Sequence, residues 1–154
     1  MQELDYEEIF KSSFDTFKVF DKLTPIEAGR SIPSVPKTIW QILNHLIIWQ
    51  GHQLSQLKKA EVKDELIELT TWIAEDECGS EVVFNDAVLI FENQICKIKD
   101  IVSKLSENGA FLQRNLKILQ DLSIHLSFHL GEIILMRRMT GNYPLPHEMK
   151  DFLN

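Results

Sequence analysis

Residues 111–139 read FLQRNLKILQDLSIHLSFHLGEIILMRRM, and no other segment says more about the architecture. The apolar side chains recur three and four residues apart, as they do along one face of an α-helix. His125 and His129 lie on the same face as Ile118, Leu122 and Met136. The segment therefore predicts a long amphipathic helix that carries two histidines toward the interior and ends before residue 141.

Four phenylalanines near the N-terminus predict a first helix. They follow the same spacing, at Phe10, Phe14, Phe17 and Phe20. This helix should end before Pro25, because the residue that precedes a proline avoids helical backbone angles. Residues 24–36 contain three prolines and a glycine, and we expect them to form a loop across one end of the fold.

Two further helices have recognisable ends. The second is expected from near Pro36, with Ser34 as its N-cap, to the basic pair at residues 58–59, where positive charge suits the helix dipole. The third is expected from its N-cap Ser80 to about Leu105. The intervening residues 60–79 are less regular, with a short helix over 64–72. Residues 147–154 are expected to form a short amphipathic tail.

Four amphipathic helices without strand signals predict an all-α fold, a four-helix bundle in a single domain over residues 1–154. The hydrophobic fraction of 44% and the charged fraction of 25% are those of an ordinary globular protein. The loops leave the order of the helices open at this point.

Composition excludes several classes of protein. A net charge of −7 disfavours a nucleic-acid binder, because phosphate neutralisation needs clustered basic residues. No apolar run approaches the ~20 residues that span a bilayer, and the acidic N-terminus does not resemble a signal peptide. Cys78 and Cys96 are too few for a disulfide framework and predict independent thiols in a reducing compartment. We therefore expect a cytoplasmic protein without a membrane or nucleic-acid partner.

The histidines are the residues that indicate a chemical function. His125 and His129 are four residues apart, so they lie about 40° apart on a helix and both imidazoles can reach one point. Zinc and nickel favour imidazole nitrogen. His45 lies among apolar residues of the second helix and should also point inward. Three histidines on two facing helices predict a metal site with positions left for water or substrate.

Each polar residue near the histidine pair has more than one possible role, and the alternatives are as follows. Glu132, one turn beyond His129, is a fourth ligand, a general base or a carboxylate at the rim of the site. Asp121 is a candidate to accept a hydrogen bond from a ligand imidazole, or a solvated residue. Arg137 or Arg138 either pairs with the helix dipole or anchors an anionic substrate group.

The two remaining histidines are weaker candidates. His52 is seven residues beyond His45, about 10 Å along the helix, too far to share a metal ion with it. It should line the pocket or lie at the end of the bundle. His147 should be solvated in the tail.

Two segments together resemble a known family. Residues 34–50, SVPKTIWQILNHLIIWQ, and residues 125–133, HLSFHLGEI, followed by an arginine pair and GNYP at 141–144, resemble the DinB-like proteins, also called DinB/YfiT-like metalloenzymes. The resemblance covers essentially the whole chain. It implies a four-helix bundle in up-down-down-up order, the ligands His45, His125 and His129 on nickel or zinc, and a homodimer. The family often has glutamine where this chain has Glu132, which adds a negative charge beside the site.

The relatives implied by this resemblance include S-transferases that use bacillithiol, mycothiol or glutathione, and maleylpyruvate isomerases. The leading hypothesis is therefore a metal-dependent thiol S-transferase acting on small electrophiles, in which coordination lowers the pKa of a low-molecular-weight thiol. Glu132 would position the thiol or deprotonate it, and Arg137 would hold a carboxylate group of the substrate. The alternatives are a metal-dependent hydrolase, a stress-linked bundle that binds a metal or ligand without turnover, and a purely structural dimer.

Overall fold

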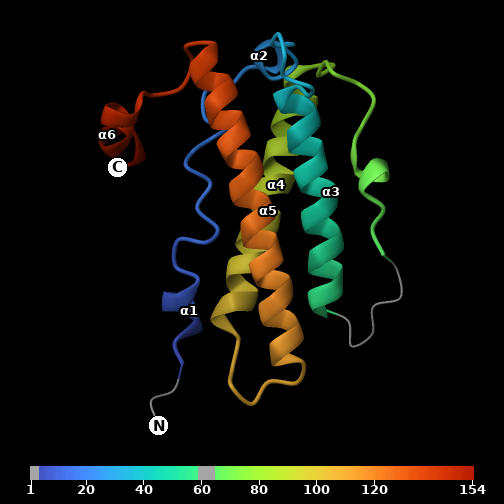
Figure 1. Cartoon of the computed structure of the whole chain (residues 1–154), viewed down its shortest axis with the longest axis vertical. Helices are drawn as coiled ribbons and strands as arrows, with labels where there is room; N and C mark the ends of the chain where they lie inside the picture. Colours follow the sequence, from blue (N-terminus) through green and yellow to red (C-terminus); the bar gives the residue numbers. More distant parts are fainter. Residues whose placement is uncertain (1–3, 59–64) are drawn as a thin grey trace.

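Three long helices form the body of the protein (Figure 1). In the computed structural model, which describes residues 4–58 and 65–154, they are α3 (Ile39–Lys58), α4 (Glu81–Ser103) and α5 (Leu112–Met139). The helix α3 packs against both α4 and α5. Figure 1 shows α3 and α4 running in the same direction and α5 running in the opposite direction.

The other elements are short, and the described residues contain helices and turns but no strand, so the all-α prediction is confirmed. The short elements are α1 (Tyr6–Ile9), α2 (Pro25–Ala28), η1 (Glu68–Thr71), η2 (Pro146–Glu148) and α6 (Met149–Leu153). None of the described helices is both long and apolar enough to cross a membrane.

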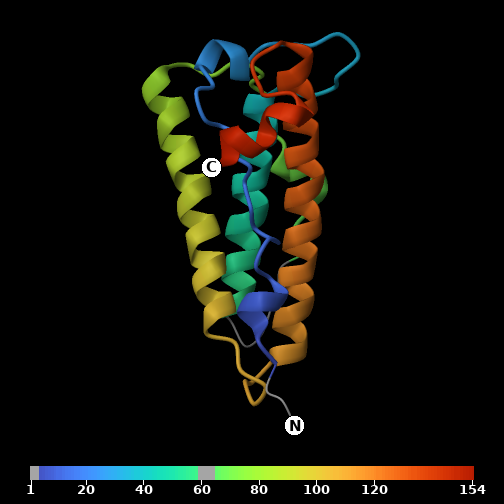
Figure 2. The ribbon, with the colours of Figure 1, turned by 90° about the vertical axis from the view of Figure 1, so that its left-hand side faces the viewer.

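The first helix predicted from the phenylalanine spacing is wrong. After α1 the chain continues as turns along the side of α4 and α5 (Figure 2). Phe17 and Lys18 have φ angles of 51° and 50°, a left-handed conformation that a right-handed helix cannot contain. The Asp15 carboxylate accepts a hydrogen bond from the backbone N–H of Phe17 at 2.7 Å, which competes with helix formation. Phe14 and Phe20 are nevertheless buried, so the spacing identified core residues but not their backbone conformation.

The N-cap predicted for the second helix is also wrong. Ser34 has a φ angle of 68° and lies in the loop before α3. The cap is formed instead by Thr38 and Gln41, whose side chains each accept a hydrogen bond from the other's backbone N–H, at 3.3 and 3.1 Å. The N-cap predicted at Ser80 is confirmed, because its hydroxyl accepts from the backbone N–H of Val83 at 3.2 Å.

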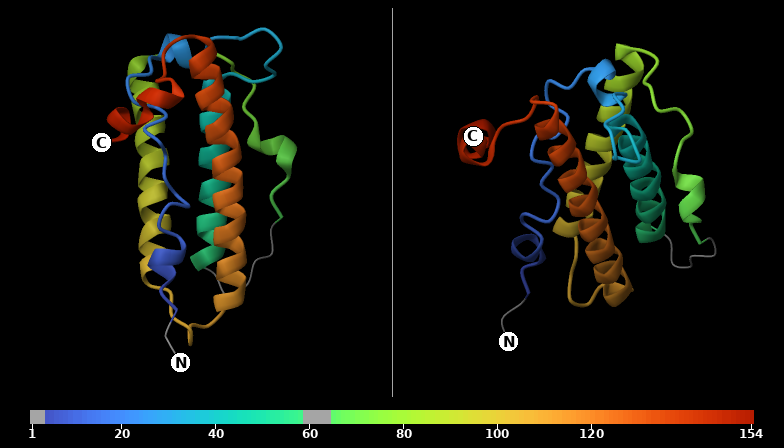
Figure 3. Two further views of the ribbon diagram at one scale, coloured as in Figure 1. Left: turned by 60° about the vertical axis from the view of Figure 1, so that its left-hand side comes forward. Right: turned by 45° about the horizontal axis from the view of Figure 1, so that its top comes forward.

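The described part of the connection between α3 and α4, residues 65–80, runs along the outside of α3 (Figure 3). It must cover this length because the two helices run in the same direction. Of the short helix expected over 64–72, the described residues contain only the four-residue 3-10 turn η1, which contacts α3. Asp64 and Lys59, which bound two of the predicted helices, lie outside the described residues. This path places the η1 turn beside the histidine-bearing part of α3.

Candidate metal centre

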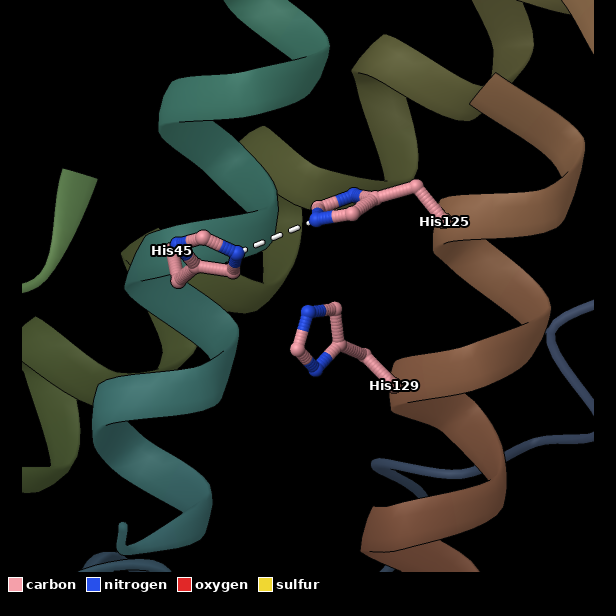
Figure 4. Close-up of side chains that lie close together, drawn as sticks. All are labelled: His45, His125 and His129. Atoms are coloured by element: carbon pink, nitrogen blue, oxygen red, sulfur yellow. Dashed lines mark hydrogen bonds between the residues drawn. The ribbon is translucent and has the colours of Figure 1, made fainter. Parts of the chain in front are cut away.

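The three predicted histidines converge between α3 and α5 (Figure 4). Each offers a ring nitrogen, and these nitrogens all lie within 4.8 Å of one another. The Nε2 atoms of His45 and His125 are 3.0 Å apart. His45 is fully buried and His129 is buried, whereas His125 is partly exposed. The group therefore lies in the interior, and His125 is its least buried member.

Helix geometry and core packing bring these rings together. His125 and His129 are one turn apart on α5, and the neighbouring Leu126, Leu130 and Ile133 are buried and hold that face of α5 in the core. On α3, Ile42 and Leu46 are buried on either side of His45. Because α3 packs against α5, the inward faces of both helices meet at the histidines.

Thr71 determines which nitrogen of His45 carries hydrogen. Its Oγ1 lies 2.7 Å from Nδ1 of His45 and donates a hydrogen bond to the Glu68 carbonyl at 2.6 Å. A hydroxyl has a single hydrogen, so Thr71 must accept from the Nδ1–H of His45. The lone pair of His45 Nε2 is therefore directed toward the other two histidines. Sequence analysis did not identify Thr71, because nothing local to residue 71 indicates a contact with residue 45.

Glu132 performs the same task for His129. Its Oε2 lies 2.6 Å from Nδ1 of His129, so the carboxylate accepts the Nδ1 hydrogen and leaves the Nε2 lone pair free. This orienting role differs from the three predicted for Glu132, which were a fourth ligand, a general base and a carboxylate at the rim. Asp121 is exposed and makes no hydrogen bond to a histidine among the described residues. The partner expected at Asp121 is found instead at Glu132.

Aromatic rings enclose the histidines. Trp72 stacks on His45 with ring centroids 3.8 Å apart and planes 5° apart. The Trp49 ring lies 4.9 Å from that of His125, and the Phe128 ring lies 5.0 Å from that of His129. These contacts restrict rotation of the imidazoles and exclude water from part of the site.

The surroundings keep two of the imidazoles neutral. Burial, with further contributions from His129 and His125, lowers the pKa of His45 to about 3, although the contact with Thr71 acts in the opposite direction. Burial and the neighbouring His129 lower the pKa of His125 to about 4. At neutral pH both rings therefore offer unprotonated nitrogens.

The donor set fits a divalent transition-metal ion. Zinc–nitrogen bonds of about 2.0–2.1 Å place tetrahedral donors roughly 3.3–3.5 Å apart, close to the separation of His45 and His125. Two of the three imidazoles have hydrogen-bond acceptors on the nitrogen that faces away from the group. Three protein donors leave a position for an outside ligand, as in catalytic zinc sites.

Arg137 is not brought to the histidines. It is buried, and its guanidinium donates to the backbone oxygens of Val19 and Asn142, each at 2.6 Å. These bonds tie the end of α5 to the N-terminal segment. Arg138 likewise donates to the carbonyl of Pro144 at 2.9 Å. Neither arginine contacts the histidine group among the bonds of the described residues.

The remaining candidates lie apart from the site. His52 forms a hydrogen bond with the Gln56 amide at 2.9 Å, and His147 is exposed. Cys78 and Cys96 are free thiols, one partly buried and one exposed.

Comparisons with protein-family models, curated proteins and solved structures give no match for this chain. Its function is therefore inferred from its own residues and geometry. The resemblance to the DinB-like proteins remains a hypothesis.

Proposed function

We propose that this chain is a divalent-metal-binding protein of the DinB-like kind that acts as a metal-dependent thiol S-transferase on small electrophiles. One observation carries the proposal. Nitrogens of His45, His125 and His129 converge from two helices, and Thr71 and Glu132 engage the outward nitrogens of two of them. Such an arrangement is typical of histidines that bind a metal ion.

The proposed fold is a four-helix bundle in up-down-down-up order. The parallel α3 and α4 and the reversed α5 agree with the last three directions of that order (Figure 1). The N-terminal segment rises beside α4 and α5 and buries Phe14, Val19 and Phe20. We propose that this segment takes the place of the first helix, although its backbone is largely irregular.

The chemistry follows from the donor set. When held by His45, His125 and His129, a zinc or nickel ion would lower the pKa of a bound thiol and favour the thiolate. The residues of the chain prepare the site for this role. Thr71 and Glu132 hold His45 and His129 in the required orientation, and the aromatic rings exclude water. The partly exposed His125 marks the side on which a thiol and an electrophile can enter.

A hydrolase built on the same site needs a free base beside the attacking water. The Glu132 carboxylate is held 2.6 Å from Nδ1 of His129, which favours an orienting role over that of a base. Glu132 is therefore a poor base for hydrolysis, and thiol transfer stays the leading hypothesis, with hydrolysis as the alternative that the assay below tests.

Metal analysis and a thiol-consumption assay test the proposal. We expect about one zinc or nickel ion per chain in the wild-type protein and little in His129→Ala. The control His147→Ala should match the wild type, because His147 is exposed and remote from the group. Loaded wild-type protein should consume bacillithiol, mycothiol or glutathione in the presence of an alkylating electrophile. Metal-free wild-type protein would refute metal binding, and hydrolysis of ester substrates without thiol consumption would favour the hydrolase.

We further propose a cytoplasmic homodimer that acts on a small molecule and binds neither nucleic acid nor membrane. The support for a dimer is an apolar stripe on α5. Its exposed members, Ile124, Phe128, Leu135 and Met139, fall within about 60° of the helix circumference. Light scattering should give twice the chain mass for the wild type and a single chain mass for Leu135→Glu. A monomeric wild type would overturn this proposal.

A further inference from the structure

Glu68 lies beside the histidine group on the η1 turn. Its Oε1 is 3.9 Å from Nε2 of His45, the nitrogen whose lone pair faces the other histidines. The side chain is 60% exposed, so its carboxylate is at the solvent side of the buried ring. It does not belong to the three residues whose donor atoms are mutually within 4.8 Å. Glu68 is thus the carboxylate at the edge of the site.

The separation of Glu68 from His45 is near that of two ligands of one metal ion. Donors bound tetrahedrally at about 2.0–2.2 Å are roughly 3.4 Å apart. The neighbouring pair of His45 and His125 is at 3.0 Å, and the pair of His45 and Glu68 is at 3.9 Å. A shift of about half an ångström would bring Oε1 to this separation from Nε2 of His45. Because Glu68 lies outside the group of three, its side chain must also turn toward His125 and His129 to share their ion.

The backbone of Glu68 is held in place while its carboxylate is held loosely. The Glu68 carbonyl accepts the hydroxyl of Thr71, which in turn accepts from His45, so the η1 turn is tied to the imidazole. The carboxylate accepts one hydrogen bond from Nε1 of Trp72, at the long distance of 3.4 Å. An exposed side chain with this weak restraint can reach a cation and leave it again.

The charge of the ion is a further reason to expect that Glu68 binds it. Imidazole ligands carry no charge, and Glu132 offers its charge only indirectly, through His129. A carboxylate bound directly to a divalent ion would halve the charge of the ion in this partly buried site. Glu132 is already engaged by His129 at 2.6 Å. Glu68 has no such short bond to a ring nitrogen.

We propose that Glu68 is a fourth protein ligand, which completes a three-histidine, one-carboxylate centre and is displaced when an outside ligand binds. This inference rests on the metal-binding part of the proposed function and is independent of the thiol-transfer reaction. It assigns to the η1 turn a direct role at the metal in addition to its contact through Thr71.

Cobalt(II) provides the test, because its visible absorption reports the ligands of the ion. Wild type, Glu68→Gln, Glu68→Asp and the control Glu65→Gln are titrated with Co²⁺, and their Zn²⁺ affinities are measured by competition with a chromogenic chelator. Glu65 is an exposed carboxylate three residues earlier. We expect Glu68→Gln to lose at least about tenfold in affinity, the loss that even an outer partner of a ligand causes, and to change the cobalt spectrum. Glu65→Gln should match the wild type.

The Glu68→Asp variant distinguishes direct binding of the carboxylate to the ion from a purely electrostatic effect of its negative charge. Aspartate keeps the negative charge but is one methylene shorter, so ligation predicts a loss similar to that of Glu68→Gln. Wild-type affinity and spectrum in Glu68→Asp would show that only charge acts and would overturn the proposal. Unchanged properties in Glu68→Gln would overturn it as well, while leaving metal binding by the histidines intact. Failure of the wild type to bind Zn²⁺ or Co²⁺ would overturn both.

Discussion

Replacing Thr71 by valine isolates the hydrogen bond that orients His45. Valine keeps the shape of the fully buried side chain and removes the hydroxyl. In the metal-bound state Nδ1 of His45 must carry its hydrogen, and in the variant that hydrogen has no acceptor. A buried donor without a partner costs about 1–3 kcal/mol.

This cost falls mainly on the metal-bound state. Without metal, His45 can move its proton to Nε2 and donate to the Nε2 of His125, 3.0 Å away. The Glu68 carbonyl, which loses the Thr71 hydrogen bond, belongs to an exposed residue and can bind water instead. About 2 kcal/mol against metal binding corresponds to a loss of roughly 30-fold in affinity. Thr71→Ser, which restores a hydroxyl, should recover most of it.

The assay is Zn²⁺ competition with a chromogenic chelator at pH 7, with urea unfolding of each metal-free variant to show that the fold persists. Thr70→Val is the matched control. Thr70 lies in the same turn and donates to the Ile67 carbonyl at 2.7 Å, but it is exposed and does not touch His45. A folded Thr71→Val protein whose Zn²⁺ affinity is within twofold of the wild type would refute the role assigned to Thr71.

Substitutions at three other positions have distinct expected outcomes, with Asp121→Ala as a control. In the same chelator assay, Glu132→Ala should lower Zn²⁺ affinity by about 10–100-fold. Glu132→Gln should lower it by less, since the amide oxygen still accepts a hydrogen bond from His129. Asp121→Ala should have no effect. Arg137→Ala should lower the free energy of unfolding in urea by about 3 kcal/mol without changing Zn²⁺ affinity, because the buried carbonyl of Val19 and the partly buried carbonyl of Asn142 lose their donor. The backbone N–H of Thr24 holds the pKa of Glu27 below its ordinary value. The Glu27 carboxylate therefore stabilises the fold at pH values above its ordinary pKa, and this stabilisation is lost as the pH falls through the lower pKa of the folded protein. Glu27→Gln should therefore be less stable than the wild type at pH 7, and the urea-unfolding difference should disappear in strong acid; a constant difference would contradict this.

Local spacing was sufficient for the three long helices and for the inward position of all three histidines. The α5 helix and its histidine pair follow from a repeat of three and four residues, since positions that far apart share a helix face whatever surrounds them. The inward position of His45 follows from its apolar neighbours in the same way. The Ser80 cap is equally local, because it depends on a hydroxyl and the N–H three residues later.

The same spacing was misleading at the N-terminus. Phe14 and Phe20 are buried as the pattern requires, but left-handed angles at Phe17 and Lys18 interrupt the helix between them. Aromatic residues have only modest helix propensity, so packing against the neighbouring helices prevails over the local preference. A helical repeat shows which side chains face the core, but a segment of turns can present the same side chains.

The tertiary structure alone decided what surrounds the histidines. Thr71 and Trp72 reach His45 from the α3–α4 connection, 26 and 27 positions later in the chain, and no repeat relates them to it. Arg137 lies on the helix that carries the histidine pair but is turned to the backbone of Val19. Helix periodicity acts over a few residues and places each histidine on a face. The nitrogen that each histidine directs inward depends on hydrogen-bond partners, and the partner of His45 comes from a distant segment that only the folded chain brings near.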